Sequence, residues 1–590
     1  LYIQGNNGID ILALNHPDTP FVSGGNLSLV SDGKISRDAH FTSGGNISIL
    51  NLSGEPTNFI SLYDPIDLLD GDFVSGEYEG PAYKVEAGGS ITFNGDVVIN
   101  SPDANFANAA PGTDEFLLGN FRALILRAGE DITITGETFT SNDAGNAGPI
   151  ILEAGGNIST GALFSRSRSA TPGNGGDITL NAGGSITVSN GLYAWTQTNN
   201  SGDITLRAID DISITDCSDS VCLESFGEGS LGTFVGASGN VSLISEQGAI
   251  NANGATINAS SGSIGGGNAG NITLFAKNNI TFNNLWARRE SEDAGSAGNI
   301  TITSQAGSID ISGGKIDTDA GTGSPNANGG DVTITAFGDI TTGSIESRGE
   351  LSGGDITLTS TGGGIDTSVG TLFTSSDNGD SGLITLEAEN DIITATIESS
   401  VGQTFMGNPV NGNSGNITIT SNTGNIDTSA GLLDSRSNNG NAGSITLTAQ
   451  KDITTEAILT LLYQDATGNS GDISLTSTEG SITTLGGLDT GITFGNGGSI
   501  TLNAKNDITT VDVFTRAPNN GLGDSGDIFL TSFAGTIDTS GGTISTLSDN
   551  GTGGAIALDA AGDIITANVL TNGAEGSGNI TITTSAGVIN

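Results

Sequence analysis

From about residue 178 onward, the chain repeats a short phrase of the form G-[DNS]-I-T-L. In each copy two apolar residues stand two positions apart, as in Ile178 and Leu180. This spacing is typical of a β-strand whose alternate side chains enter a core. The copies return about every 29 residues, which indicates a solenoid with one coil per copy. Fifteen copies open at Ile178, Ile204, Val241, Ile272, Ile300, Val332, Ile356, Ile384, Ile417, Ile445, Ile473, Ile500, Ile528, Ile556 and Ile580.

A second apolar strand follows each first strand, and from Ile204 onward its distance alternates. It lies eight residues on in one coil, as from Ile204 to Ile212, and nine in the next, as from Val241 to Ile250. The fourth residue after the opening one changes in step: it is Ala in the eight-residue coils and Ser or Thr in the others. The sequence therefore predicts a repeating unit of two coils, about 56 residues long.

A third, looser apolar pair follows the second strand, for example Leu285 and Ala287, and then a Ser/Asn/Gly-rich loop. Strands this short bury a face only when each coil stacks on the next. Propellers, leucine-rich repeats and hexapeptide helices have other periods. We therefore predict an all-β chain, a right-handed parallel β-helix (solenoid) with three short strands per coil and about 20 coils.

The first part of the chain is less regular, because long insertions separate its strand pairs. We expect residues 1–110 to form irregular N-terminal coils with loop insertions. Residues 111–590 should form the regular array. The upstream strand pairs stand at Leu27/Ile35, Tyr83/Ile91, Leu124/Ile132 and Ile150/Ile158.

The net charge of the chain argues against one class of binding partner, the nucleic acids. Lys and Arg total 17 against 65 Asp and Glu, a formal net charge of −48. Such a field repels phosphate backbones, so we do not expect nucleic-acid binding. No run of about 18 apolar residues occurs, so we expect no membrane span. The chain begins without Met and its last strand, from Ile580 to Ile589, lacks a polar cap, which predicts further coils or end-to-end or lateral self-association.

Two cysteines, Cys217 and Cys222, stand five residues apart. This spacing would close a small disulfide loop in an oxidising compartment, or would leave two free thiols. We favour the disulfide, because the metal alternative lacks a nearby His.

Aspartates recur at the strand edges. Carboxylates and carbonyls are the ligands that calcium prefers, so these positions are candidates for loosely bound Ca²⁺. We favour turn chemistry instead, because Asp, Asn and Ser interchange freely there. No other cofactor is expected. The calcium candidates are Asp331, Asp355, Asp472 and Asp527.

One outward residue separates the two inward residues of each first strand, and it is usually Thr, as at Thr357 and Thr418. Strand propensity and stacking of Thr on its copies explain this column. The alternative is a regular hydroxyl surface that binds ice or a mineral.

Three aromatic side chains should point outward, because their neighbours are expected to point inward. Tyr193 and Trp195 alternate with Leu192 and Ala194, and Trp286 alternates with Leu285 and Ala287 in the same way. Exposed aromatics are candidate contacts for a cell-surface glycan or protein. A covering loop would equally bury them.

A catalytic site would need a cluster of reactive side chains that departs from the repeat pattern. Cations are sparse, and His16 and His40 lack a context that suggests a nucleophile. We therefore expect no catalytic residues and no enzyme. A carbohydrate-active β-helix enzyme remains an alternative.

Several phrases resemble the filamentous-haemagglutinin family of large exoproteins, in particular the cyanobacterial type. They are SGGNISI at 43–49, AGGSITFNGDVVI at 87–99, AGEDITITG at 128–136 and SGNITITSNTGNIDTSAGLL at 414–433. The resemblance implies two-partner secretion through an outer-membrane partner, a right-handed β-helical shaft, and adhesion or aggregation. The family's Asn-Pro-Asn secretion motifs are not visible. We therefore expect a secreted, extracellular structural or adhesive rod or fibre at the cell surface.

Overall fold

The computed structural model divides the chain into two compact units, residues 1–293 and 294–590, which are described separately. It describes residues 1–12, 21–38, 41–61, 66–68, 71–168, 172–217, 221–228, 236–262, 267–290, 295–321, 326–402, 411–462, 468–491, 495–517 and 523–590.

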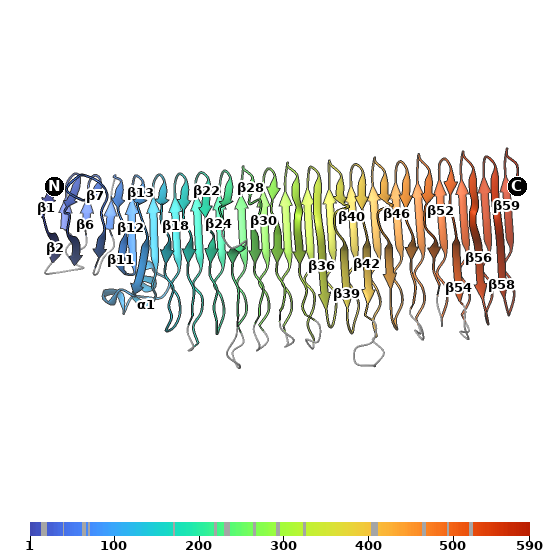
Figure 1. The fold of residues 1–590 in the computed structure, drawn as a ribbon, viewed down its shortest axis with the longest axis horizontal. Coiled ribbons are helices and arrows are strands. Elements are labelled where there is room, and N and C mark those ends of the chain that lie inside the picture. Colours follow the sequence, from blue (N-terminus) through green and yellow to red (C-terminus); the bar gives the residue numbers. More distant parts are fainter. Residues whose placement is uncertain are drawn as a thin grey trace. The chain divides into compact units, whose positions relative to one another are not determined.

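Within each unit the coils stack as parallel strands and form a β-solenoid, as the sequence predicts (Figure 1). A regular coil contributes three strands, and each described strand pairs with its copies in the neighbouring coils. Within each unit the first strands form a sheet, with ten described strands in the first unit and eleven in the second. The handedness of the coils stays a prediction.

In the first unit, the first strands are β3 (Phe21–Ser23), β6 (Phe41–Ser43), β9 (Ile66–Leu68), β12 (Tyr83–Ala87), β15 (Leu124–Ala128), β18 (Ile150–Ala154), β21 (Ile178–Ala182), β24 (Ile204–Ala208), β27 (Val241–Ser245) and β30 (Ile272–Ala276). The second strands are β1 (Tyr2–Gln4), β4 (Leu27–Val30), β7 (Ile47–Leu50), β10 (Phe73–Ser75), β13 (Ile91–Phe93), β16 (Ile132–Ile134), β19 (Ile158–Thr160), β22 (Ile186–Ser189), β25 (Ile212–Thr215), β28 (Ile250–Asn251) and β31 (Ile280–Thr281). The third strands are β2 (Gly8–Leu12), β5 (Lys34–Asp38), β8 (Phe59–Ser61), β11 (Tyr78–Pro81), β14 (Val97–Ser101), β17 (Thr138–Phe139), β20 (Leu163–Phe164), β23 (Leu192–Tyr193), β26 (Val221–Glu224), β29 (Thr256–Asn258) and β32 (Asn284–Trp286).

In the second unit, the first strands are β33 (Ile300–Ser304), β35 (Val332–Ala336), β37 (Ile356–Ser360), β40 (Ile384–Ala388), β43 (Ile417–Ser421), β46 (Ile445–Ala449), β49 (Ile473–Ser477), β52 (Ile500–Ala504), β55 (Ile528–Ser532), β57 (Ile556–Ala560) and β59 (Ile580–Thr584). The second strands are β38 (Ile365–Thr367), β41 (Ile392–Thr394), β44 (Ile426–Thr428), β47 (Ile453–Thr455), β50 (Ile482–Thr484) and β53 (Ile508–Thr509). The third strands are β39 (Leu372–Ser376), β42 (Ile397–Val401), β45 (Leu433–Arg436), β48 (Ile458–Leu459), β51 (Leu488–Asp489) and β54 (Val513–Ala517). In four coils the second and third strands run together, as β34 (Ile309–Asp317), β36 (Ile340–Gly349), β56 (Ile537–Ser548) and β58 (Ile564–Gly573).

The core consists of columns of apolar side chains, one residue per coil. Ile356 pairs in register with Ile384, and Ile384 pairs with Ile417. All three are fully buried. The predicted stacking of these positions is therefore confirmed, and burial of such columns supplies the main stabilising free energy of each unit.

The alternation of Ala with Ser or Thr has a hydrogen-bonding cause. In a nine-residue coil, the Ser421 hydroxyl donates to the Asn390 carbonyl oxygen at 2.7 Å and accepts from the Gly424 amide at 3.0 Å. The longer turn thus leaves an amide that needs an acceptor, which the serine supplies. In the next, eight-residue coil the paired position is the buried Ala449. The two-coil unit follows from this exchange.

Stacked glycines explain the invariant start of the repeat phrase. A Cβ on Gly415 would lie 2.0 Å from the Gly382 carbonyl oxygen in the coil before. That separation excludes any side chain at the position. The neighbouring third strand caps the same backbone, because the hydroxyl of Ser435 donates to the Gly415 carbonyl oxygen at 3.0 Å.

One sequence interpretation of the first unit needs correction. Leu27 lies in the column of Ile47, so Leu27/Ile35 is a second-and-third strand pair rather than a first-and-second one. The first strand of that coil is the three-residue β3, which is too short to show the apolar repeat. Across residue 110, where the regular array is expected to begin, β12 and β15 pair in register.

The insertion near residue 110 forms the two short helices of the first unit, η1 (Ala104–Phe106) and α1 (Asp114–Asn120). The Thr113 side chain caps α1 by accepting from the Phe116 amide. Ion pairs from Asp114 to Lys84 of β12 and Arg127 of β15 attach the helix to the outer face of the first-strand sheet.

Candidate functional site

In the first unit, the outward side chains of the third strands form an aromatic column. Phe139, Phe164 and Tyr193 occupy the same register position in β17, β20 and β23. Their rings are stacked, with centroids 4.9 and 5.0 Å apart. Because the rings cover one another's faces, mainly their edges remain for contact with a ligand.

Arg166 lies against this column. Its guanidinium carbon stands 4.0 Å from the centre of the Phe164 ring, 5.5 Å from that of Tyr193 and 5.9 Å from that of Trp195. These contacts stabilise the cation through the ring faces. Burial, followed by repulsion from Arg168, lowers the pKa of Arg166 to about 10. Its Nε is buried and has no hydrogen-bond partner among the described residues.

A hollow of about 500 Å³ opens beside Arg166 and extends over four successive coils. Burial raises the pKa of the Glu224 carboxyl, and Arg166 and a hydrogen bond with Asn258 partly oppose this shift. Asn190 holds a left-handed backbone conformation with φ of 68°. The lining residues are Glu137, Ala162, Phe164, Arg166, Asn190, Tyr193, Val221 and Glu224.

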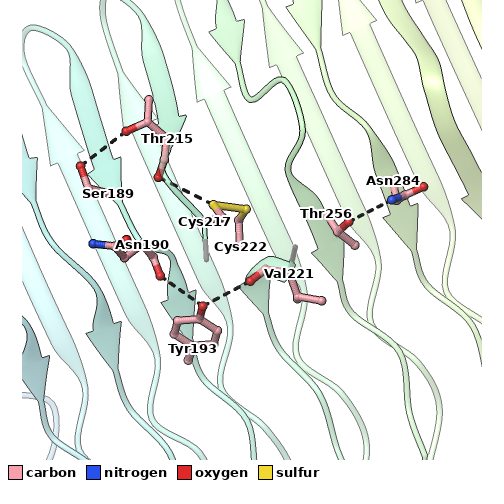
Figure 2. Close-up of a disulfide and its surroundings, with 9 residues drawn as sticks. All are labelled: Ser189, Asn190, Tyr193, Thr215, Cys217, Val221, Cys222, Thr256 and Asn284. Carbon is pink, nitrogen blue, oxygen red and sulfur yellow. Dashed lines mark hydrogen bonds between the residues drawn. A yellow bond between two sulfur atoms is a disulfide. The ribbon is translucent and has the colours of Figure 1, made fainter. Parts of the chain in front are cut away.

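A disulfide lies at the edge of this hollow and joins Cys217 to Cys222 (Figure 2). Cys222 is the extra residue of a β-bulge, since Val221 pairs with Thr256 and Leu223 with Ile257. The bulge lets Val221 reach back to the aromatic column, where its carbonyl oxygen accepts from the Tyr193 hydroxyl at 3.2 Å. The disulfide therefore fastens the chain that forms one wall of the hollow.

The three predicted contact residues have different surroundings. Leu192, Ala194, Leu285 and Ala287 are buried, so Tyr193, Trp195 and Trp286 lie on the outer side of their strands, as expected. Trp195 and Trp286 are partly exposed. Tyr193 is only 8% exposed, because neighbouring rings and Arg166 cover it and its hydroxyl also donates to the Asn190 carbonyl oxygen at 3.1 Å.

Trp286 continues the same column three coils beyond Tyr193, through Glu224 and Asn258. The Arg288 guanidinium stacks over it, 4.9 Å from the ring centre. Unlike Arg166, Arg288 has a carboxylate partner, Glu290, at 2.7 Å. The structure thus places the predicted aromatics on one face of the first unit.

The four calcium candidates act as links between coils. Asp331 Oδ1 accepts from the Asp355 amide at 2.9 Å, and Asp355 Oδ1 accepts from the Leu383 amide at 2.8 Å. Asp472 and Asp527 make the same contact to Ser499 and Ala555. These bonds are the turn chemistry that the sequence favours. Within the described ranges, no group of three or more His, Cys, Asp or Glu side chains is arranged to hold a metal.

The outer face of the first strands in the second unit carries a hydroxyl array. The strands stack in register and present two outward columns of side chains. Among the described residues, no protein side chain or backbone group forms a hydrogen bond with these hydroxyls. One column contains Thr301, Thr333, Thr357, Thr385, Thr418, Thr446, Ser474 and Thr501, and the other contains Thr303, Thr335, Thr359, Glu387, Thr420, Thr448, Thr476 and Asn503.

Charged clusters elsewhere are already paired. In the first unit an open groove of about 900 Å³ runs along the first-strand sheet, and Arg127 there pairs with Glu86, Asp114 and Glu153. The hydrogen bond from Arg127 is the main cause that lowers the pKa of Asp114. The charged side chains of this groove therefore pair with one another and stabilise the structure.

In the second unit, Asp434 of β45 is fully buried and Asp319, which follows β34, is partly buried. Burial raises the pKa of both Asp319 and Asp434 to about 6. Arg436 forms an ion pair with Asp434, and Arg348 with Asp319. The shift arises mainly because burial disfavours the charged form of each acid.

Sequence reasoning missed Arg166, Glu224 and Asn190 as members of one site. They stand at most 31 residues from the predicted Tyr193 in the chain, but only the strand register shows that they share a hollow. The two histidines, His16 and His40, lie outside the described residues.

Comparison with known proteins returns no match from family models, curated sequences or solved structures. Among the described residues, no helix has the length and apolar character needed to cross a bilayer.

Proposed function

We propose that this chain is a secreted structural and adhesive protein of the cell surface, which presents a binding face on a β-solenoid shaft. The observation that carries this proposal is the outward aromatic and arginine face of the first unit, where Arg166, Trp195 and Trp286 stand on stacked coils. Strands locked in register hold such side chains rigidly, which lowers the entropic cost of binding.

Two further observations support an extracellular setting. The Cys217–Cys222 disulfide is the kind of bond that persists in oxidising compartments. The repeat phrases resemble filamentous-haemagglutinin exoproteins, which implies export through an outer-membrane partner. The net charge of −48 keeps such a chain soluble outside the cell.

Labelling of intact cells tests the location. An antibody against the chain should bind intact cells, and protease added outside should remove the signal. A pool that is found only in the cytoplasm would contradict the proposal.

Adhesion of protein-coated beads to host or neighbouring cells tests the binding face. The double variant Trp195→Ala and Trp286→Ala should lower the number of bound beads several-fold. Phe533→Ala is the matched control, because Phe533 is an aromatic residue of the second unit and is 63% exposed. Equal loss with the control would contradict the assignment of the binding face.

The hydroxyl array of the second unit favours a second candidate function, the binding of ice or a mineral surface. Outward Thr residues recur about every 4.8 Å from coil to coil and about 7 Å along each strand, a flat lattice suited to a crystalline surface. Thermal hysteresis of freezing tests it. Thr357→Lys with Thr418→Lys should abolish hysteresis, and unchanged hysteresis or none in the unaltered protein would exclude this function.

A further inference from the structure

We propose that the hollow beside Arg166 binds one uncharged sugar residue of a glycan. This inference rests on the proposed adhesive function and names its ligand. The hollow has a volume of about 500 Å³, within the range of small-molecule sites.

The polar lining selects the class of ligand. Arg166 offers only hydrogen-bond donors, Glu137 and Glu224 offer acceptors when ionised, and Asn190 offers both. An anion would face the two carboxylates, and a cation would face the guanidinium. A neutral polyhydroxyl ligand satisfies all four residues, because each hydroxyl both donates and accepts.

Arg166 is the residue that a ligand would stabilise most. Its side chain makes no hydrogen bond or ion pair with the described residues, and its Nε is buried. Leaving a buried donor unsatisfied costs about 1–3 kcal/mol. Three other arginines near outward aromatics do have carboxylate partners: Arg288 has Glu290, Arg348 has Asp319 and Glu346, and Arg516 has Asp489.

The walls of the hollow suit the apolar side of a sugar ring. Ala162, Val221 and the ring edges of Phe164 and Tyr193 provide carbon surface between the polar groups. The site is also preorganised: the Tyr193 hydroxyl is tied to two backbone carbonyls, and the disulfide holds the bulge that carries Val221 (Figure 2). The lining residues would therefore lose little conformational entropy when a ligand binds.

Calorimetric titration of the full chain tests the inference with named probes. The neutral probes are cellohexaose, mannohexaose and maltohexaose. The acidic probe is hexagalacturonate and the cationic probe is hexaglucosamine. At least one neutral probe should bind, with an affinity that changes little between low and high salt.

Variants locate the site. Arg166→Gln should weaken binding of the neutral probe about tenfold, the loss of a hydrogen bond to a charged group, and Glu224→Gln should weaken it several-fold. Arg516→Gln is the matched control, because Arg516 also stacks on an outward aromatic, Phe514 at 4.7 Å, but has Asp489 as its ion partner. It should leave affinity unchanged. Circular dichroism verifies that each variant is folded.

Four outcomes would overturn the inference. They are no binding of any neutral probe, tighter binding of hexagalacturonate that falls with salt, tighter binding of hexaglucosamine, or an equal loss with Arg516→Gln. Analysis of the probe after incubation shows whether the chain cleaves it, and cleavage would replace binding with catalysis. A cytoplasmic location with intact sugar binding would contradict the proposed function alone. A surface location and adhesion without sugar binding would contradict this inference alone.

Discussion

The two units share their inner columns and differ in their outer ones. Both stack Ile, Leu and Ala in register, as Ile178 on Ile204 in the first unit and Ile384 on Ile417 in the second. Outside, the first unit carries stacked aromatics, an unpaired arginine and a helical insertion. The second unit carries the longer hydroxyl array, and its Asp434 is fully buried beside Arg436. The comparison teaches that inner columns determine the fold while outer columns are free to specialise, so function is to be sought in the outer ones.

The largest effect is expected when a variant disrupts the inner columns, which both units share. Replacing the fully buried Ile384 by Asp should destabilise the second unit by about 4 kcal/mol or more, since it buries a charge in an apolar column. Replacing the adjacent outward Thr385 by Asp should change stability by about 0.5 kcal/mol or less.

Ile204→Asp and Thr205→Asp are the corresponding inward and outward variants of the first unit. Urea unfolding measures the free energy of unfolding of all four variants. If Thr385→Asp cost as much as Ile384→Asp, the division into inner and outer columns would be wrong.

A smaller effect concerns Asp434, a fully buried carboxylate of the second unit. Burial raises the pKa of Asp434 from 3.8 to about 6, and its side chain is fully buried beside Arg436. As pH rises, the Asp434 carboxyl of the unfolded chain loses its proton first, so the contribution of this group to the free energy of unfolding is fully present below about pH 4 and falls by about 3 kcal/mol by pH 7.

Asp434→Asn should remove this part of the pH dependence, as measured by urea unfolding across the pH range. Asp427→Asn is a control with a carboxylate of the same unit outside that ion pair. An unchanged pH profile in Asp434→Asn would contradict the assignment.

A change of about 1–2 kcal/mol in the free energy of unfolding tests the explanation of the two-coil unit. Ser421→Ala should cost this much, because it leaves the Gly424 amide and the Asn390 carbonyl without the bonds that Ser421 supplies. Ala449→Ser should also destabilise, since its eight-residue coil lacks the extra amide. Thermal unfolding measures both. If Ala449→Ser were stabilising, the alternation would need another cause.

The smallest effect is expected on the hydroxyl array. Thr357→Val should change the free energy of unfolding by about 0.5 kcal/mol or less, because the outward hydroxyl makes no described protein contact and Val keeps the strand preference. A loss above about 1 kcal/mol in urea unfolding would show that these hydroxyls stabilise the sheet.

The inner columns can be predicted from the sequence because the spacing of apolar residues that forms them lies within one short strand and recurs in every coil. The spacing of Ile417 and Ile419 is the strand period itself, and the exchange of Ala449 with Ser421 marks the turn length. The binding hollow could not be predicted in this way. Its composition depends on which outer residues align after loops of different length, and on the bulge at Cys222 that moves Glu224 into the column of Tyr193. Tyr193 was expected to be exposed, and packing by non-neighbouring residues buries it.

Spin-label distances within the second unit test the stacking of coils most directly. One label is fixed at Thr301 and the second is placed in turn at Thr418, Thr446 and Thr501, all in one outer column. At about 4.8 Å per coil, the distances should rise stepwise to about 19, 24 and 34 Å, set by the number of coils between the labels. Distances that did not increase in equal steps per coil would contradict the parallel solenoid.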